Sequence, residues 1–174
     1  MLAAHLAAQH RDDADVFVVG DYLYPVESET KHRQASDVSV AFGCPEVKHD
    51  IYPQVVFDVL SPGWRYTDMQ AKFTFYEKHG AEEYYILYPE FPAHAEGYLR
   101  GEGKLVRVEE IDGFVSPRLG LRFSLDRGQL GVFDRNGRQM RTMEELALEN
   151  DQRERTAEKL AAKLRELGVD PDTL

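Results

Sequence analysis

Gln54-Val-Val-Phe-Asp-Val-Leu60 is the stretch that decides the fold of this 174-residue chain. It follows Pro53, is followed by Ser61-Pro-Gly63, and is apolar on both faces except at Asp58. A strand covered on both faces is typically a continuous apolar run, so we expect a central strand here. An unpaired carboxylate in such a strand would cost on the order of several kcal/mol. Asp58 therefore needs a partner.

A helix and a second buried strand are expected after this central strand. Thr67 and Gln70 have the spacing of a capping box, and Gly80 follows the cationic residues that suit a helix C-terminus. The expected buried stripe of the helix is Met69, Phe73 and Tyr76. Glu83-Tyr-Tyr-Ile-Leu-Tyr88 then reads as a buried strand. We expect its tyrosines to lie in the core rather than to stack on bases.

The chain before the central strand also divides into recognisable elements. Leu2 to Gln9 is rich in Ala and Leu and predicts a short helix, and Asp15 to Tyr24 reads as strand, turn, strand with the turn at Gly20-Asp21. Asp37 to Phe42 alternates between apolar and polar residues and predicts a half-buried strand. If the stretch from Asp15 to Tyr24 is counted as one strand, the order of elements up to residue 88 is helix, strand, strand, strand, helix, strand.

Two hairpins are predicted after residue 88. Gly101-Glu-Gly103 separates two strand-like stretches, and so does Asp126-Arg-Gly128. The paired stretches are 95–100 with 104–109, and 121–125 with 129–133. We expect all four to extend one edge of the central sheet. The fold class is then α/β (α+β), with a mixed central sheet, added antiparallel hairpins and a C-terminal helix.

The C-terminal segment differs from the rest of the chain. A charged helix begins near Met143 or Glu144, with apolar residues at helical spacing from Ala157 to Leu167. It either folds back on the domain or forms a short coiled-coil seam in a homodimer, because its apolar repeat spans under two heptads. We therefore divide the chain into a domain at 1–143 and a charged helix at 144–174.

Composition narrows the class of protein. Hydrophobic residues at 43% and charged residues at 30% are typical of a globular protein. No apolar run approaches the roughly 20 residues that span a bilayer, and the N-terminus has no basic region typical of a secretory signal. The single cysteine, Cys44, excludes an internal disulfide and suits a reducing compartment. We expect a cytoplasmic protein without a membrane segment.

The net charge of −10 bears on nucleic-acid binding. A protein that neutralises many phosphates through a broad cationic face is not acidic. Both the domain and the C-terminal segment carry more acids than bases. The charge therefore disfavours tight, sequence-independent binding to DNA.

Three polar residues are the candidates for chemistry. Asp37 and Asp58 lie on strands that could be neighbours, and Lys72 borders the apolar stripe of the helix. Two close carboxylates repel each other unless a cation such as Mg²⁺ or Mn²⁺ lies between them, and an ammonium nearby can assist a water. The structural alternatives stay open: Asp37 as a turn residue, Asp58 in a structural ion pair and Lys72 on the surface. No zinc spacing, P-loop or GxSxG motif is present.

The amino-acid sequences of four segments, taken together, resemble those of a known family. They are Ala35 to Gly43, Val55 to Pro62, Asp68-x3-Lys72-x3-Tyr76-x3-Gly80, and Glu83 to Pro89. Together they resemble the Uma-type restriction endonuclease family, formerly a domain of unknown function, which belongs to the PD-(D/E)XK nuclease superfamily. The resemblance covers most of the chain and implies a restriction-endonuclease-like core. The element order derived above is also the core order of that superfamily.

The resemblance implies roles for the three candidates. Asp37 looks like the first acidic metal ligand, Asp58 like the second, and Lys72 like the catalytic lysine, with Mg²⁺ or Mn²⁺ as cofactor. The superfamily's usual lysine position, two residues after the second acid, holds Leu60. In addition, Ser36, Asp58 and Tyr88 stand where the family usually has Pro, Glu and often Asp.

These observations predict a function. The leading hypothesis is a metal-dependent endonuclease that hydrolyses phosphodiester bonds in DNA, with Asp37 and Asp58 holding the metal and Lys72 assisting the attacking water. One alternative is a catalytically silent module for binding or assembly that keeps the nuclease fold. Another is a nuclease that acts on RNA.

Overall fold

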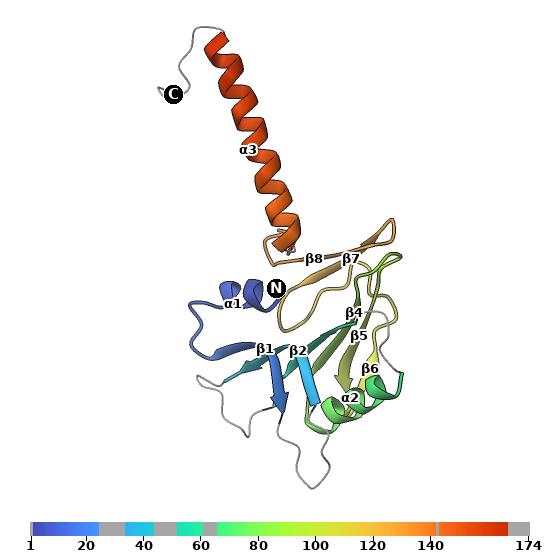
Figure 1. Cartoon of the computed structure of the whole chain (residues 1–174). Helices are drawn as coiled ribbons and strands as arrows, with labels where there is room; N and C mark the ends of the chain where they lie inside the picture. Colours follow the sequence, from blue (N-terminus) through green and yellow to red (C-terminus); the bar gives the residue numbers. More distant parts are fainter. Residues whose placement is uncertain (1, 25–33, 44–51, 61–65, 142, 167–174) are drawn as a thin grey trace. The chain divides into compact units, whose positions relative to one another are not determined.

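The computed structural model describes residues 2–24, 34–43, 52–60, 66–141 and 143–166. The chain divides into two compact units, one at 2–140 and one from Arg141 onward. The first unit holds two helices and eight strands among its described residues (Figure 1). In chain order they are α1 (Leu2–Gln9), β1 (Val16–Tyr24), β2 (Gln34–Phe42), β3 (Val55–Val59), α2 (Tyr66–Lys78), β4 (Glu83–Tyr88), β5 (His94–Gly101), β6 (Lys104–Arg107), β7 (Arg122–Asp126) and β8 (Gln129–Phe133). The second unit holds α3 (Met143–Glu166).

A six-stranded mixed sheet in the order β1-β2-β3-β4-β5-β6 is the centre of the first unit. β3 and β4 are parallel, with Asp58 opposite Ile86, and α2 forms the crossover between them. The other neighbouring strands of this sheet are antiparallel. The predicted fold class and the order α1-β1-β2-β3-α2-β4 are confirmed, and β3 is central as expected.

The sheet is covered on both faces. On one face, Leu6 of α1 and Phe123 of the β7–β8 hairpin pack against Phe57 and Tyr85 of the sheet. On the other face, Tyr76 of α2 packs in a second apolar cluster. Figure 1 shows α1 and the β7–β8 hairpin on one side of the sheet and α2 on the other. This double covering is why the residues of β3 before Val59 are all buried.

Three local predictions were wrong. The residues around Gly20-Asp21 do not form a turn between two strands: Asp21 has a φ of 51°, yet β1 continues through it. β2 is buried on both faces rather than one, since Ser39 and Ala41 are covered as well as Val40. The β7–β8 hairpin forms a sheet of its own instead of extending the central one.

The helices agree more closely with the sequence. α2 begins at Tyr66, one residue before the expected cap at Thr67, and ends before Gly80, which has a φ of 86°. A positive φ just past a helix is the conformation that glycine adopts without a steric cost. α3 begins at Met143, as predicted, and Leu160 on it is 61% exposed.

Some predictions concern residues outside the described ranges. They include Cys44, the Ser61-Pro-Gly63 segment that follows the central strand, and Leu167 at the end of the apolar repeat. Within the described part of the chain, no helix has the length and apolar character needed to cross a membrane.

Candidate active site

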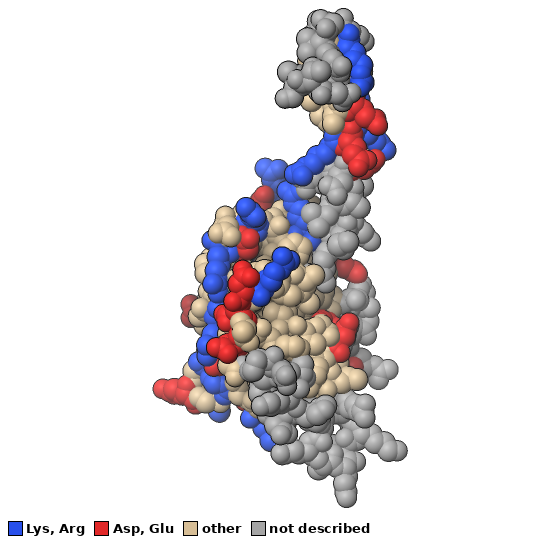
Figure 2. Space-filling model, turned by 90° about the vertical axis from the view of Figure 1, so that its left-hand side faces the viewer, with Lys and Arg blue, Asp and Glu red and all other residues tan. Residues whose placement is uncertain are grey.

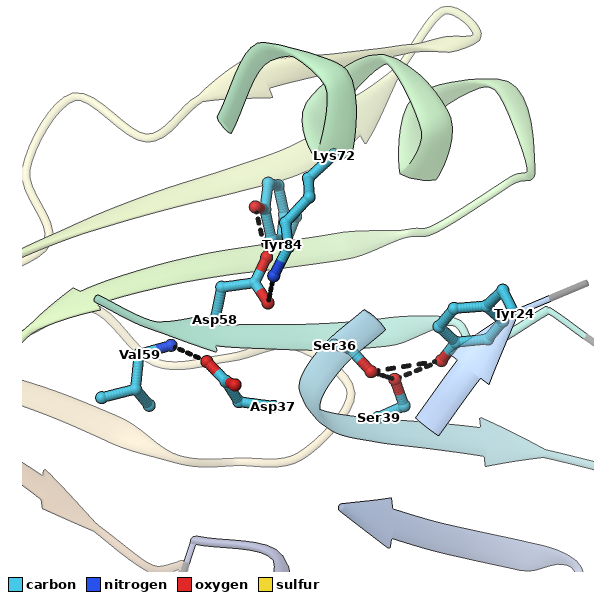
Figure 3. Close-up of polar contacts among 8 residues, drawn as sticks. All are labelled: Tyr24, Ser36, Asp37, Ser39, Asp58, Val59, Lys72 and Tyr84. Carbon is cyan, nitrogen blue, oxygen red and sulfur yellow. Dashed lines mark hydrogen bonds and ion pairs between the residues drawn. The ribbon is translucent and has the colours of Figure 1, made fainter. Parts of the chain in front are cut away.

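A buried ion pair joins α2 to the central strand. Lys72 Nζ lies 2.7 Å from Asp58 Oδ1 and donates a hydrogen bond to it (Figure 3). Asp58 is fully buried and Lys72 is 5% exposed. The sequence placed Lys72 at the border of the helix's apolar stripe, whereas the structure turns it inward onto the sheet. Asp58 thus has the partner that its burial requires.

A second donor completes the surroundings of Asp58. The Tyr84 hydroxyl, on the neighbouring strand β4, donates to Asp58 Oδ2 at 2.7 Å. Burial raises the pKa of the Asp58 carboxyl above its usual value, and the nearby Asp37 raises it further. Lys72 and the Tyr84 hydrogen bond act in the opposite direction. These two donors favour the ionised carboxylate inside the core.

Asp37 lies on the strand next to Asp58. The β2–β3 ladder pairs Val38 with Phe57, and Asp37 and Asp58 are the next residue on each strand. Asp37 Oδ2 accepts a hydrogen bond of 2.6 Å from the backbone N–H of Val59. Figure 3 shows Asp37 on the β2 side of β3 and Lys72 reaching Asp58 from the helix side. The structure therefore brings Asp37, Asp58 and Lys72 into one neighbourhood.

The backbone around Asp37 departs from regular pairing. The β1–β2 ladder pairs Gly20 with Val38 and Tyr22 with Ser36, and leaves out the pair between them. Ser36 and Ser39, three residues apart, nevertheless share a hydrogen bond. Regular alternation would put residues three apart on opposite faces of the sheet. Asp37 thus sits where β2 changes which residues face α2.

The donor set can be compared with the chemistry of a metal ion. In the described part of the chain, no three His, Cys, Asp or Glu side chains gather into a metal site. Mg²⁺ is usually held by one or two carboxylates, with waters and substrate phosphates completing its coordination. The Asp37 and Asp58 carboxylates fit that pattern by number and by donor type, although both Asp58 oxygens already accept protein hydrogen bonds.

Hydroxyl groups around Asp58 were missed by the sequence analysis. Tyr24 forms a buried hydrogen-bonded cluster with Ser36 and Ser39 (Figure 3). Burial raises the pKa of Tyr24 to about 12. The Tyr76 hydroxyl is buried and has no hydrogen-bond partner among the described residues. A buried tyrosine needs a partner for its hydroxyl, and that need was the available signal.

A comparison with models of protein families shows which family the chain belongs to. Residues 1–161 match the model of Uma2, described as "Putative restriction endonuclease". The chain belongs to the Uma2 family. The match covers nearly all of the described chain, and the expected resemblance is confirmed.

One solved structure agrees with this Uma2 assignment at the level of fold. It is described as "a putative nuclease belonging to DUF820" from Anabaena variabilis, and it superposes with a TM-score of 0.50 at 16% sequence identity. The match covers 66% of this chain and 66% of that one, so the chain spans about two thirds of its length. At this identity the likeness concerns the fold alone. No curated protein matches the chain.

Leu60 stands at the position where the resemblance seen in the sequence would place a lysine. Leu60 lies two residues after Asp58 and is buried in the cluster on the α2 face of the sheet. A lysine there would lie among apolar side chains. Lys72 of α2, by contrast, is a buried lysine that contacts Asp58 on this face of the sheet.

Proposed function

We propose that this protein is a metal-dependent endonuclease that hydrolyses phosphodiester bonds in DNA. The observation that carries the proposal is the buried contact between Lys72 of α2 and Asp58 of β3. The β2–β3 register, continued by one residue past the last pair, places Asp37 opposite Asp58. Membership of the Uma2 family supports a nuclease in general. The metal, the residues and the DNA substrate are the specific parts of the proposal.

Asp37 and Asp58 would hold Mg²⁺ or Mn²⁺. A bound divalent cation supplies positive charge for the phosphate oxygens and lowers the pKa of a coordinated water. The Asp37 carboxylate is oriented by the backbone N–H of Val59, and the Asp58 carboxylate by Lys72 and Tyr84. Ligands oriented by such hydrogen bonds hold a metal in a defined geometry.

Lys72 would act on the attacking water and on the phosphate. An ammonium carries three N–H donors, and one of them binds Asp58 Oδ1. In the proposed reaction another N–H contacts the water or a phosphate oxygen, where it stabilises the negative charge that develops. Burial strengthens this interaction because the surrounding dielectric constant is low.

The acidic charge limits how DNA would be bound. On the face in Figure 2, basic side chains are interspersed with acidic ones. Arg118 pairs with Glu82 at 2.6 Å, and Arg107 lies 3.8 Å from Glu96. We therefore propose local contacts near the cut phosphate rather than tight sequence-independent binding.

A cleavage assay with point variants tests the proposal. Wild-type protein with Mg²⁺ should cut DNA, and Lys72→Ala, Asp37→Asn and Asp58→Asn should each lose at least about 100-fold in rate. Lys78→Ala is the matched control, because Lys78 is an exposed lysine of the same helix. Absence of cleavage by the wild type on varied DNA would overturn the proposal. Cleavage of RNA in preference to DNA would correct the substrate.

One observation favours the alternative of a catalytically silent module. Both oxygens of Asp58 are already bonded within the protein, as in a purely structural ion pair. In that case the exposed face of α3 around Leu160 would join two copies as a homodimer. The alternative predicts no rise in melting temperature with Mg²⁺ or Mn²⁺, whereas a metal site predicts a rise that grows with metal concentration.

A further inference from the structure

A groove lies beside the candidate active site, on the α2 face of the sheet. Its volume is about 540 Å³, within the range of pockets that bind small molecules. Its walls come from one helix and two strands. They include Met69 and Phe73 of α2, Ile86 and Tyr88 of β4, and Glu96 and Tyr98 of β5.

The strand register ties this groove to Asp58. Asp58 pairs with Ile86 across the parallel β3–β4 ladder, and Ile86 pairs with Glu96 across β4–β5. The three residues thus form one row across the sheet. Two strand spacings separate Asp58 from Glu96, a distance of about 10 Å. A nucleotide next to the cut phosphate would reach the groove from there.

Aromatic rings give the groove its chemical character. Tyr88 stacks on His94 with ring centroids 4.0 Å apart and planes 8° apart. Tyr98 meets Phe73 edge to face at 4.9 Å and is hydrogen bonded to Glu96. These contacts hold the rings in fixed positions, as a stacking platform requires. The sequence predicts Tyr88 in the core, whereas Tyr88 is half-buried and lines the groove.

We propose that this groove binds one unpaired nucleobase of the strand that the active site cuts, an inference that rests on the proposed function. Aromatic side chains stack on any base. The Glu96 carboxylate at the groove accepts a hydrogen bond from Tyr98 and has further lone pairs that can accept one from a base edge. A base within a duplex is stacked and paired, so it could enter only after leaving the helix. The substrate is therefore single-stranded DNA or DNA with an unpaired base at the cut.

Binding of labelled oligonucleotides by fluorescence anisotropy tests the groove, with EDTA present so that nothing is cut. Tyr88→Leu should lose about tenfold in affinity for a single-stranded oligonucleotide, and Tyr88→Phe, which keeps the ring, should not. The matched control is Phe91→Ala, since Phe91 is a 79% exposed aromatic outside the groove. An oligonucleotide of abasic sites should bind wild type and Tyr88→Leu equally, because neither complex can stack a base.

Two results would overturn the proposal that the groove binds a base. One is equal affinity of wild type and Tyr88→Leu for the normal oligonucleotide. The other is a loss of affinity in Tyr88→Leu that is as large for the abasic oligonucleotide as for the normal one. Cleavage with Mg²⁺ is measured separately. If the wild type cuts DNA and Tyr88→Leu binds and cuts it equally well, the base-binding proposal fails while the proposed nuclease stands. Wild type that binds through Tyr88 but cuts nothing would overturn the proposed nuclease and leave a nucleobase-binding site.

Discussion

Lys72 of α2 and Asp58 of β3 form an ion pair 2.7 Å long inside the protein, with the Asp58 side chain fully covered. The two residues are 14 positions apart and meet only because α2 packs across the sheet after β3. A buried pair of this kind often adds little net stability, since removing both charges from water costs about as much as their attraction returns. Its position beside Asp37 is what suggests a functional reason for it.

Removing one member of this pair should be costly, and removing both should not. Lys72→Met leaves the Asp58 charge buried without its cation, which should lower the free energy of unfolding by about 3 to 5 kcal/mol. The double variant Lys72→Met with Asp58→Leu should recover most of that loss while abolishing any cleavage. Urea unfolding measures both effects. A loss below about 1 kcal/mol in the single variant would contradict the buried pair.

The same variant should be sensitive to pH. Burial already raises the pKa of Asp58, and Lys72 opposes that shift, so Lys72→Met should raise the pKa further. When the pKa of a carboxyl is higher in the folded state than in the unfolded state, its contribution to stability is complete below the unfolded-state pKa. That contribution is lost as the pH rises through the folded-state pKa. The stability deficit of Lys72→Met should therefore shrink as the solution is made acidic. A deficit that is constant with pH would indicate that Asp58 is not the cause.

Glu83 and Glu82 provide a matched pair at the start of β4. Glu83 is 2% exposed and accepts hydrogen bonds from the Tyr85 hydroxyl, the Ser116 hydroxyl and the Arg118 backbone N–H. Glu83→Ala leaves these donors without an acceptor and should lower stability by at least about 3 kcal/mol. Glu82→Ala removes only a largely exposed ion pair and should cost about 0 to 1 kcal/mol. Equal losses in the two variants would contradict this difference.

Tyr76 is a position where a substitution should not lower the stability of the protein. Its hydroxyl is buried without a hydrogen-bond partner in the described part of the chain. Tyr76→Phe removes that polar atom and keeps the ring, so stability should stay the same or rise by about 1 kcal/mol. Thermal unfolding measures the change. A clear loss of stability would show that the hydroxyl has a partner in solution.

Buried tyrosines predict how the protein responds to alkali. Burial raises the pKa of Tyr24 to about 12, and it also raises the pKa values of Tyr76, Tyr84 and Tyr85. An unfolded tyrosine ionises near pH 10, so the unfolded state binds fewer protons between about pH 10 and 12. Stability from these groups is complete below pH 10 and lost as the pH rises through the folded values. The phenolate absorbance of these four tyrosines should therefore appear together with unfolding; ionisation of all nine tyrosines in a protein that is still folded would contradict the burial.

The elements of the fold could be predicted wherever a local pattern determines them. The apolar run around Asp58 predicted β3, and Gly80 marked the end of α2. The β7–β8 hairpin itself was visible in Asp126-Arg-Gly128, but its separate sheet was not, because packing against distant residues such as Leu6 decides where a hairpin lies. Similarly, Gly20-Asp21 has turn chemistry, and the positive φ at Asp21 is present, yet pairing with β2 keeps the strand continuous.

The site was predictable to a smaller extent. The burial of Asp58 required a partner. Helix spacing placed Lys72 only at the border of the apolar stripe, where it could equally be a surface lysine, and the family resemblance added weight to it. Tyr84 was missed as the second donor to Asp58 because the direction of a hydroxyl depends on the tertiary packing of β3, β4 and α2. The groove lined by Tyr88 was missed for the same reason, since three separate elements form it.

The most direct test of the central proposal is the anomalous diffraction of a crystal soaked in Mn²⁺. If Asp37 and Asp58 hold the metal, an anomalous peak will lie within coordination distance of carboxylate oxygens of both residues, with Lys72 adjacent. A peak elsewhere, or no peak at Asp37 and an unchanged ion pair between Asp58 and Lys72, would contradict it.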